Sequence, residues 1–243
     1  MQKLVDFNEI CREKNARQIT EWAINKFGIE RIVLASSFSA EDQVLTHMLV
    51  SENPKARIFT LDTGRHFQET YDVWQKTTDH FKISYEVAFP DSKEVAHLTY
   101  KHGLNLFYND VESRKECCTV RKTRPLQKIL STVDAWIVGL RSEQSVTRTG
   151  LSPIEWDGAN KIYRISPLCN WKESEVFAYA REKALPMSVL YEKGFRSIGC
   201  APCTRPIGPE DDVRAGRWWW EDPEHKECGL HNRPNKGTIH GPS

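Results

Sequence analysis

Apolar residues along the chain follow two spacings in turn, one typical of buried strands and one typical of helices. The run RIVLASS (31–37) is apolar and β-branched and has the length of a buried parallel strand. In the SFSAED segment that follows, Ser39 and Asp42 are spaced as in a capping box. Four apolar residues then recur at helical spacing: Val44, Leu45, Met48 and Leu49. The pattern predicts a strand, a tight turn and a helix.

The same alternation continues along most of the chain. Similar apolar runs predict strands at 56–62, 83–89, 134–140 and 161–168. Helical spacing predicts helices at about 67–81, 92–103, 118–130 and 170–184. The first of these helices presents Phe67, Tyr71, Trp74 and Phe81 on one face. The last is predicted to be capped by Asn170 and Glu173, with an inward face formed by Val176, Phe177 and Ala180. Strands that alternate with helices favour an α/β fold with a doubly wound, mostly parallel sheet.

Both ends of the chain differ from this central region. The first 18 residues read as the start of a helix, without an apolar signal core or a cleavage pattern. From about Gly194, residues rich in Gly, Pro, Cys and Trp replace the periodic apolar spacing, and the last residues, NRPNKGTIHGPS, show no burial pattern. We predict one domain over 1–227, with an N-terminal helical extension, and a flexible tail over 228–243.

Composition narrows the class of protein. A chain of 243 residues with 39% hydrophobic content suits one large α/β domain. The formal net charge of +1 gives no global reason to expect nucleic acid or a membrane as a partner, and no apolar run reaches the length of a membrane span. The simplest location is the cytoplasm. The seven cysteines are therefore expected to be thiols, metal ligands or catalytic groups and not disulfides.

Four of the cysteines form two close pairs. Cys117 and Cys118 are adjacent, and Cys200 and Cys203 form a C-x-x-C motif. Four thiolates suit either a [4Fe–4S] cluster or a tetrahedral zinc ion. A vicinal pair is awkward on one small ion and easier on a cube whose corners lie farther apart, so the cluster is favoured. The alternative is that the vicinal pair is buried as two small apolar residues.

Cys228 stands apart from these pairs, in the segment EHKECGLH near the C-terminus. His225, Lys226 and His231 would favour its thiolate, and Gly229 would permit movement. A mobile thiol in an electropositive setting suits a nucleophile that enters and leaves a site. A solvent-exposed bystander thiol explains the same residues equally well. The remaining pair, Cys11 and Cys169, lies in helix-like or strand-like sequence and is expected in the core.

Polar residues follow several of the predicted strands, where α/β sheets bind ligands. The turn Ser36–Ser39 offers three hydroxyls and a helix N-terminus for an anion, but it has no glycine and suits a small anion better than a triphosphate. Other candidate loops are 61–65 and 139–148, and Arg214 and Arg217 precede three tryptophans. Arginine suits a bidentate grip on sulfate or phosphate oxygens. A capped helix and surface ion pairs are the structural alternatives.

Taken in order, seven segments resemble those of the assimilatory, iron–sulfur-containing adenylyl-sulfate reductases: SSFSAEDQVL, LDTGRHFQETY, CCTVRKTRPL, GLRSEQS, GCAPCTRP, RAGRWWWE and KECGLH. These enzymes are relatives of the 3′-phosphoadenylyl-sulfate reductases within the PP-loop adenine-nucleotide group. The resemblance spans about Ser36 to His231. Its most specific parts are CC-x-x-R-K, C-x-P-C-T-R and E-C-G-L-H.

The resemblance implies a role for individual residues. A [4Fe–4S] cluster, one per chain, would be held by Cys117, Cys118, Cys200 and Cys203. The catalytic residues would be Cys228, as the nucleophile, and Lys122, between the cluster and the substrate sulfate. The phosphosulfate would be contacted by Arg148, Arg214 and Arg217. The modified PP-loop would be formed by Ser36, Ser37, Phe38 and Ser39, although relatives often carry Gly or Gln where this chain has Ser39. The adenosine would be bordered by Leu61, Asp62, Thr63 and Gly64.

The implied activity is the reduction of adenylyl sulfate to sulfite and AMP through an S-sulfonate on Cys228. Thioredoxin or glutaredoxin would be the electron donor, and the reaction would serve sulfate assimilation and cysteine biosynthesis. Nucleic acid and a membrane are not expected as partners, as the net charge indicated, and the sequence leaves open whether the chain forms a homo-oligomer. The cluster is predicted to have a structural and electrostatic role, in which it positions Lys122, and to take no part in net electron transfer.

Three rival interpretations remain. The chain could reduce 3′-phosphoadenylyl sulfate, alone or as a second substrate, although enzymes strict for that nucleotide generally lack the four cluster cysteines. It could be a PP-loop enzyme that modifies tRNA, but such enzymes carry a Gly-Gly-x-Asp-Ser-type loop and usually a basic RNA face, where this chain has SFSAED and a net charge near zero. It could also be a zinc-stapled nucleotide-binding module without catalytic activity.

Overall fold

The computed structural model describes residues 2–144 and 150–222. Arg148, Cys228 and the tail predicted at 228–243 lie outside the described residues. No helix within the described ranges has the length and apolarity that a membrane span requires.

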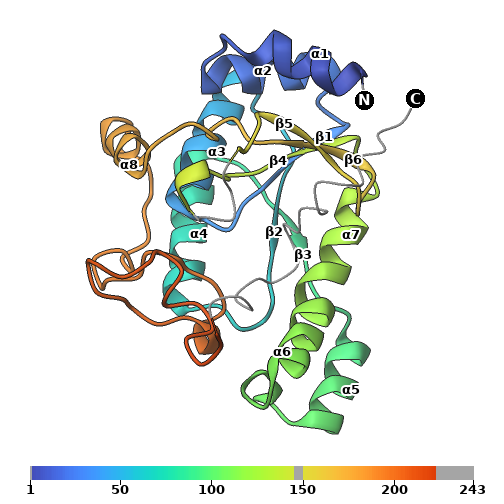
Figure 1. Cartoon of the computed structure of the whole chain (residues 1–243), viewed down its shortest axis with the longest axis vertical. Coiled ribbons are helices and arrows are strands. Elements are labelled where there is room, and N and C mark those ends of the chain that lie inside the picture. Colours follow the sequence, from blue (N-terminus) through green and yellow to red (C-terminus); the bar gives the residue numbers. More distant parts are fainter. Residues whose placement is uncertain (1, 145–149, 223–243) are drawn as a thin grey trace.

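A six-stranded sheet forms the centre of the molecule, in the order β3-β2-β1-β4-β6-β5 (Figure 1). Its strands are β1 (Ile32–Ala35), β2 (Ile58–Leu61), β3 (Glu86–Ala88), β4 (Ala135–Ile137), β5 (Ile154–Asp157) and β6 (Ile162–Ile165). Neighbours pair in parallel, except that β5 pairs antiparallel with β6. The predicted fold class is confirmed. The chain moves from β1 to β2 and β3 on one side and then to β4 on the other, which makes the carboxyl ends of β1 and β4 a topological switch point where ligands bind.

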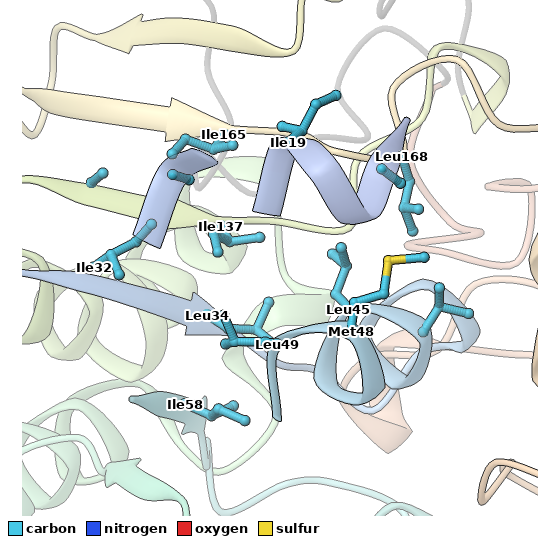
Figure 2. Packing of buried hydrophobic residues seen from close by; sticks show 14 of the residues in the cluster. Ile19, Ile32, Leu34, Leu45, Met48, Leu49, Ile58, Ile137, Ile165 and Leu168 are labelled. Atoms are coloured by element: carbon cyan, nitrogen blue, oxygen red, sulfur yellow. The ribbon is translucent and has the colours of Figure 1, made fainter. Parts of the chain in front are cut away.

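The described helices are α1 (Gln2–Cys11), α2 (Ala16–Phe27), α3 (Ala40–Glu52), α4 (Gln68–Phe81), α5 (Ser92–His102), α6 (Val111–Cys118), α7 (Arg124–Leu130) and α8 (Glu173–Glu182). Helices α1, α2, α3 and α8 pack on one face of the sheet, and α7 packs on the other. Successive residues of a strand point to opposite faces of the sheet, and both faces are buried here, as expected for parallel strands covered on both sides. In β1, Ile32 and Leu34 face the first layer and Val33 the second. Figure 2 shows the first layer, with Leu34, Leu49 and Ile137 close together.

Several predicted boundaries hold and others shift. The hydroxyl of Ser39 accepts the Asp42 N–H and caps α3, as the spacing predicted. The prediction that Asn170 caps α8 is wrong: the helix begins after Lys172, whose N–H is accepted by the Glu175 carboxylate at 2.7 Å. The aromatic face predicted for α4 is half-buried, and the fully buried positions are Thr70, Val73 and Thr77.

The helix predicted at 118–130 begins earlier and contains an irregular turn. It starts at Val111, after Asp110 has capped it by accepting the Ser113 N–H at 2.7 Å. The first part escaped prediction because its sequence, VESRKE, has little apolar periodicity. Between α6 and α7 the residues Thr119–Thr123 form a π-turn, so the two helices run as one long column in Figure 1. A π-turn rotates the side chains on either side of it relative to a regular helix, and such turns often occur at functional sites.

Truncation of Ile137 tests the described packing of the sheet. Ile137 is 1% exposed and lies between helices and neighbouring strands in the larger core cluster. We expect Ile137→Val to lower the free energy of unfolding by about 0.5–1.5 kcal/mol and Ile137→Ala by about 2–5 kcal/mol, because the second change leaves a larger cavity. Urea unfolding of both variants measures the difference. Equal free energies for the two variants would contradict the described packing.

Candidate active site

A cavity of about 270 Å³ opens at the carboxyl ends of β1, β2 and β4. Its walls come from the turn after β1, from the end of β2, from the loop after β4 and from two segments near the end of the described chain, 196–199 and 213–218. The cavity therefore lies at the switch point of the sheet, as the general rule for open α/β sheets requires.

The turn Ser36–Ser39 is held in shape from inside the protein. The carboxylate of Asp42 accepts the N–H of Ser37 at 2.6 Å and its hydroxyl at 2.7 Å. Burial, more than any other factor, raises the pKa of Asp42 to about 6, and the donors on Ser37 work against that rise. Phe38 has a left-handed backbone (φ 61°), and its ring packs 5.5 Å from Trp74 and 5.1 Å from Tyr85. The aromatic contacts fix a conformation that a non-glycine residue rarely adopts.

The loop after β2 is held by a second set of hydrogen bonds. Asp62 accepts the N–H of Gly64 at 2.8 Å and the hydroxyl of Tyr71 at 2.9 Å, and Gly64 has a positive φ of 69°. Leu61 and Thr63 line the cavity, whereas the Asp62 carboxylate accepts hydrogen bonds that stabilise the loop. The ring of His66 is 2.8 Å from the carbonyl oxygen of Leu61. Burial is the main reason that the pKa of His66 lies below its ordinary value, so this imidazole is neutral near pH 7.

The four paired cysteines line one small cavity next to the first. Cys117 and Cys118 end α6, Cys200 precedes the short helical turn Ala201–Cys203, and Cys203 is the last residue of that turn. All four are buried, and together they belong to one packed cluster with Trp218. The structure thus brings together two pairs that lie more than 80 positions apart in the sequence. Within the described ranges, no three or more His, Cys, Asp or Glu side chains are arranged to hold a single metal ion.

The protonation of these thiols differs with their neighbours. Burial and the nearby Cys118 raise the pKa of Cys117 to about 11, and burial and Cys200 raise that of Cys203 to about 12. Burial also acts to raise the pKa of Cys200, but Lys122, the Thr63 hydroxyl and Arg217 outweigh it and hold the pKa below its ordinary value. The Thr63 oxygen is 3.2 Å from the Cys200 sulfur. Of Cys117, Cys200 and Cys203, Cys200 is therefore the thiol that most favours a thiolate.

Two glycines allow the segment 214–218 to lie against the loop that contains Cys200 and Cys203. The Cys203 carbonyl accepts the N–H of Trp218 at 3.1 Å, and the Arg205 N–H donates to the Gly216 carbonyl at 3.0 Å. A Cβ atom on Gly216 would meet the Arg205 carbonyl oxygen, and one on Gly199 would meet the guanidinium of Arg217. Because neither glycine has a side chain, the loop after Cys203 and the segment 214–218 pack closely. This brings Arg214 and Arg217 to the wall of the larger cavity.

Lys122 and Trp218 form a wall shared by the two cavities. Trp218 is 1% exposed and has a left-handed backbone (φ 41°), a strained conformation that is common at functional sites. The guanidinium carbons of Arg114 and Arg217 lie 4.6 Å and 4.7 Å from the centre of its ring. Arg114 is also held by Glu221 through two hydrogen bonds of 2.9 Å and 2.7 Å. A ligand that contacts Lys122 and Trp218 in the larger cavity would therefore lie directly beside the cysteine cavity.

This arrangement agrees with the comparison to known proteins. The family described as "Phosphoadenosine phosphosulfate reductase domain" matches residues 31–206. The chain belongs to this reductase family. It is 48% identical over 215 residues to an adenosine 5′-phosphosulfate reductase of Allochromatium vinosum, covering 87% of this chain and 84% of that one. It is 44% identical over 202 residues to the adenosine 5′-phosphosulfate reductase of Burkholderia cepacia, covering 83% and 81%.

A solved structure supports the same assignment. The phosphoadenylyl-sulfate reductase of Candida auris, determined as a phosphate complex, aligns with a TM-score of 0.74 at 25% identity and covers 84% of this chain and 97% of that one. The predicted family and the prediction of an oxidoreductase acting on sulfur are confirmed. Of the predicted site residues, the turn 36–39, Leu61, Thr63, Lys122, Arg214 and Arg217 line the larger cavity of the reductase.

Sequence reasoning missed a buried ion-pair network beside this cavity. Glu41 accepts hydrogen bonds from Arg141 at 2.8 Å and from Gln144 at 3.0 Å, and Arg141 is 3.1 Å from Glu143. The network ties the N-terminus of α3 to the loop after β4. The one sign of this close approach in the sequence was Gly139, at the start of that loop. A Cβ there would lie 2.6 Å from the Asp42 carboxylate of α3, so only a glycine lets the loop come this near to the helix.

The ion pair between Arg114 and Glu221 provides a test of how the reductase holds Trp218. The two side chains are 0% and 2% exposed. We expect Glu221→Gln to lower the free energy of unfolding by about 3–5 kcal/mol, because it leaves the buried Arg114 charge without its carboxylate. The double variant Arg114→Met with Glu221→Leu should lose less, because no buried charge remains. Denaturant unfolding measures both. A double variant less stable than the single one would contradict this account.

Proposed function

We propose that this reductase converts adenylyl sulfate to sulfite and AMP with electrons from thioredoxin or glutaredoxin, in sulfate assimilation. The proposal is supported by relatives at 40–48% identity that are named adenosine 5′-phosphosulfate reductase. The observation that carries it is the wall of Lys122 and Trp218 between the strand-end cavity and the four cysteines. A cytoplasmic location fits the six described cysteines, all of which are free thiols.

In this proposal the adenosine lies near Leu61 and Thr63, at the end of β2. The phosphosulfate then points toward three cations that line the cavity: Lys122, Arg214 and Arg217. Arg148, which lies outside the described residues, is proposed to join them. A thiolate must approach a dianionic group, and fixed cations offset that repulsion and stabilise the negative charge that develops on the leaving phosphate oxygen. Because Arg217 is only 7% exposed, its charge is weakly screened by water.

The cysteine cavity fits a [4Fe–4S] cluster by the chemistry of its donors. Four buried sulfurs line one space, which is the usual ligand set for such a cluster. The side chains of Arg65, Arg121 and Lys122 line the same space and would compensate the negative charge of four thiolates. We propose that Cys117, Cys118, Cys200 and Cys203 hold the cluster. When bound, the cluster would supply a rigid anchor for the four cysteines and an electrostatic partner for Lys122.

Cys228 is proposed as the nucleophile. Its thiolate attacks the sulfur of adenylyl sulfate, an S–S bond forms, the S–O bond to the phosphate breaks, and AMP leaves with the electron pair. The product is an enzyme S-sulfonate. A thiolate of the reduced donor then attacks the Cys228 sulfur, and sulfite leaves with the electrons of the broken S–S bond. The donor's second thiol resolves the mixed disulfide, so that the donor ends oxidised and Cys228 is restored.

The Cys228→Ser variant tests the covalent step. We expect it to bind adenylyl sulfate but to form no S-sulfonate and to release no sulfite, because the hydroxyl is a far weaker nucleophile than a thiolate. Mass spectrometry of the anaerobic protein mixed with substrate should show an added SO₃ on the peptide that contains Cys228 only in the wild type. Normal turnover by the variant would remove Cys228 from the mechanism.

A pair of Lys122 variants tests the electrostatic role of the wall. We expect Lys122→Ala to lower kcat/KM by about 100-fold or more, as for the loss of a charged group that stabilises a transition state. Lys122→Arg keeps the charge and should recover part of that loss. Assays of sulfite release from adenylyl sulfate with reduced thioredoxin give both values, and the same assay with 3′-phosphoadenylyl sulfate defines the substrate. A fully active Lys122→Ala enzyme would argue against a role for the ammonium.

A further inference from the structure

The turn after β1 contains an anion of its own. Asp42 is 5% exposed, and its carboxylate accepts both the N–H and the hydroxyl of Ser37, at 2.6 Å and 2.7 Å. In α/β proteins the equivalent turn and helix N-terminus usually turn such donors toward the phosphates of a nucleotide. Here the carboxylate takes the place that a phosphate oxygen would otherwise occupy at Ser37.

Neighbouring donors of the turn are also directed at internal acceptors. The N–H of Phe38 is 3.3 Å from the hydroxyl oxygen of Ser36, and the N–H of Ala40 donates to the Tyr191 hydroxyl at 2.9 Å. The N–H of Asp42 itself is accepted by Ser39. A phosphate that entered the turn would have to break these bonds before it could accept any of the same donors.

Packing keeps the Asp42 carboxylate in this position. One of its oxygens lies so close to Gly139 that a Cβ there would be 2.6 Å away. Glu41, the preceding residue, is fixed by Arg141 and Gln144. The turn is thus backed by two buried carboxylates, of which Glu41 is matched by a guanidinium. The partners of the Asp42 carboxylate are the hydroxyl and amide donors of Ser37, which leave its negative charge in place.

We propose that Asp42 is a specificity-determining residue that excludes nucleoside triphosphates such as ATP from the strand-end cavity. This inference rests on the proposed function, because it assumes that an adenosine 5′-phosphoryl group binds there. A phosphosulfate, or a phosphoryl group alone, can be met by the cations at 122, 214 and 217 that line the same cavity. A triphosphate is longer, and any phosphate that reaches the turn meets a buried negative charge and no open donor at Ser37.

The test compares AMP and ATP binding to the anaerobic full-length protein by isothermal titration calorimetry, without added divalent cations. Two variants remove the charge: Asp42→Asn, whose amide oxygen can still accept the Ser37 N–H, and Asp42→Ser, which has a shorter side chain. The control is Asp157→Asn, because Asp157 is another buried carboxylate that accepts a backbone N–H, from Asn160, but lies at the end of the edge strand β5.

We expect the wild type and Asp157→Asn to bind AMP about tenfold or more tightly than ATP, and the Asp42 variants to reduce that preference by about tenfold or more, the scale of one nearby buried charge. An unchanged preference in a folded Asp42 variant would overturn the proposal, as would a variant that binds neither nucleotide. Equal binding of AMP and ATP by the wild type would overturn it even if both variants failed to fold. Failure of the wild type to bind AMP would instead refute the proposed nucleotide site.

Discussion

The shared wall of Lys122 and Trp218 is the constraint on which the rest of the site depends. Lys122 lies in the π-turn that follows the vicinal cysteines, and its side chain lines both the cysteine cavity and the larger cavity. Trp218 reaches this wall only in a left-handed backbone conformation, and the buried pair of Arg114 and Glu221 holds the segment there. The strain at Trp218, of order 1–3 kcal/mol, has to be offset by these contacts. Because Lys122 and Trp218 line both cavities, a change that displaces either side chain alters the two cavities together.

The distribution of buried charge determines which charges a ligand meets in the larger cavity. Arg114 and Arg141 are each buried against a carboxylate, so their charges are largely cancelled before they reach a ligand. Lys122 and Arg217 instead act on Cys200, whose pKa they hold below its ordinary value against the effect of burial. On the turn after β1 the sign reverses, because Asp42 brings a negative charge into the same large cavity. A ligand therefore meets cations on the wall beside the cysteines and an anion at the turn.

The parts of the fold that could be predicted from sequence are those with strong local patterns. The apolar runs of β1, β2, β4 and β6 and the Ser39 cap were visible, because burial on both faces of a sheet and a capped helix leave clear signals. The antiparallel strand β5 is four residues long and was not predicted. The start of α6 was missed because its buried residues include Arg114, which no apolar periodicity reveals. The cysteine pairing was predicted, but the ion pairs of Glu41 and Glu221 depend on contacts 100 and 107 residues apart, which local patterns cannot encode.

We infer that the cysteine cavity and the larger cavity, the proposed nucleotide site, act as one unit through their common wall. The most direct measurement is the visible circular dichroism of anaerobically purified Cys228→Ser protein during titration with adenylyl sulfate. The account predicts an iron–sulfur spectrum that changes saturably with substrate, because the ligand and the four cysteines share Lys122 and Trp218. Substrate that binds, as shown by equilibrium dialysis, while the iron–sulfur spectrum stays unchanged would contradict it.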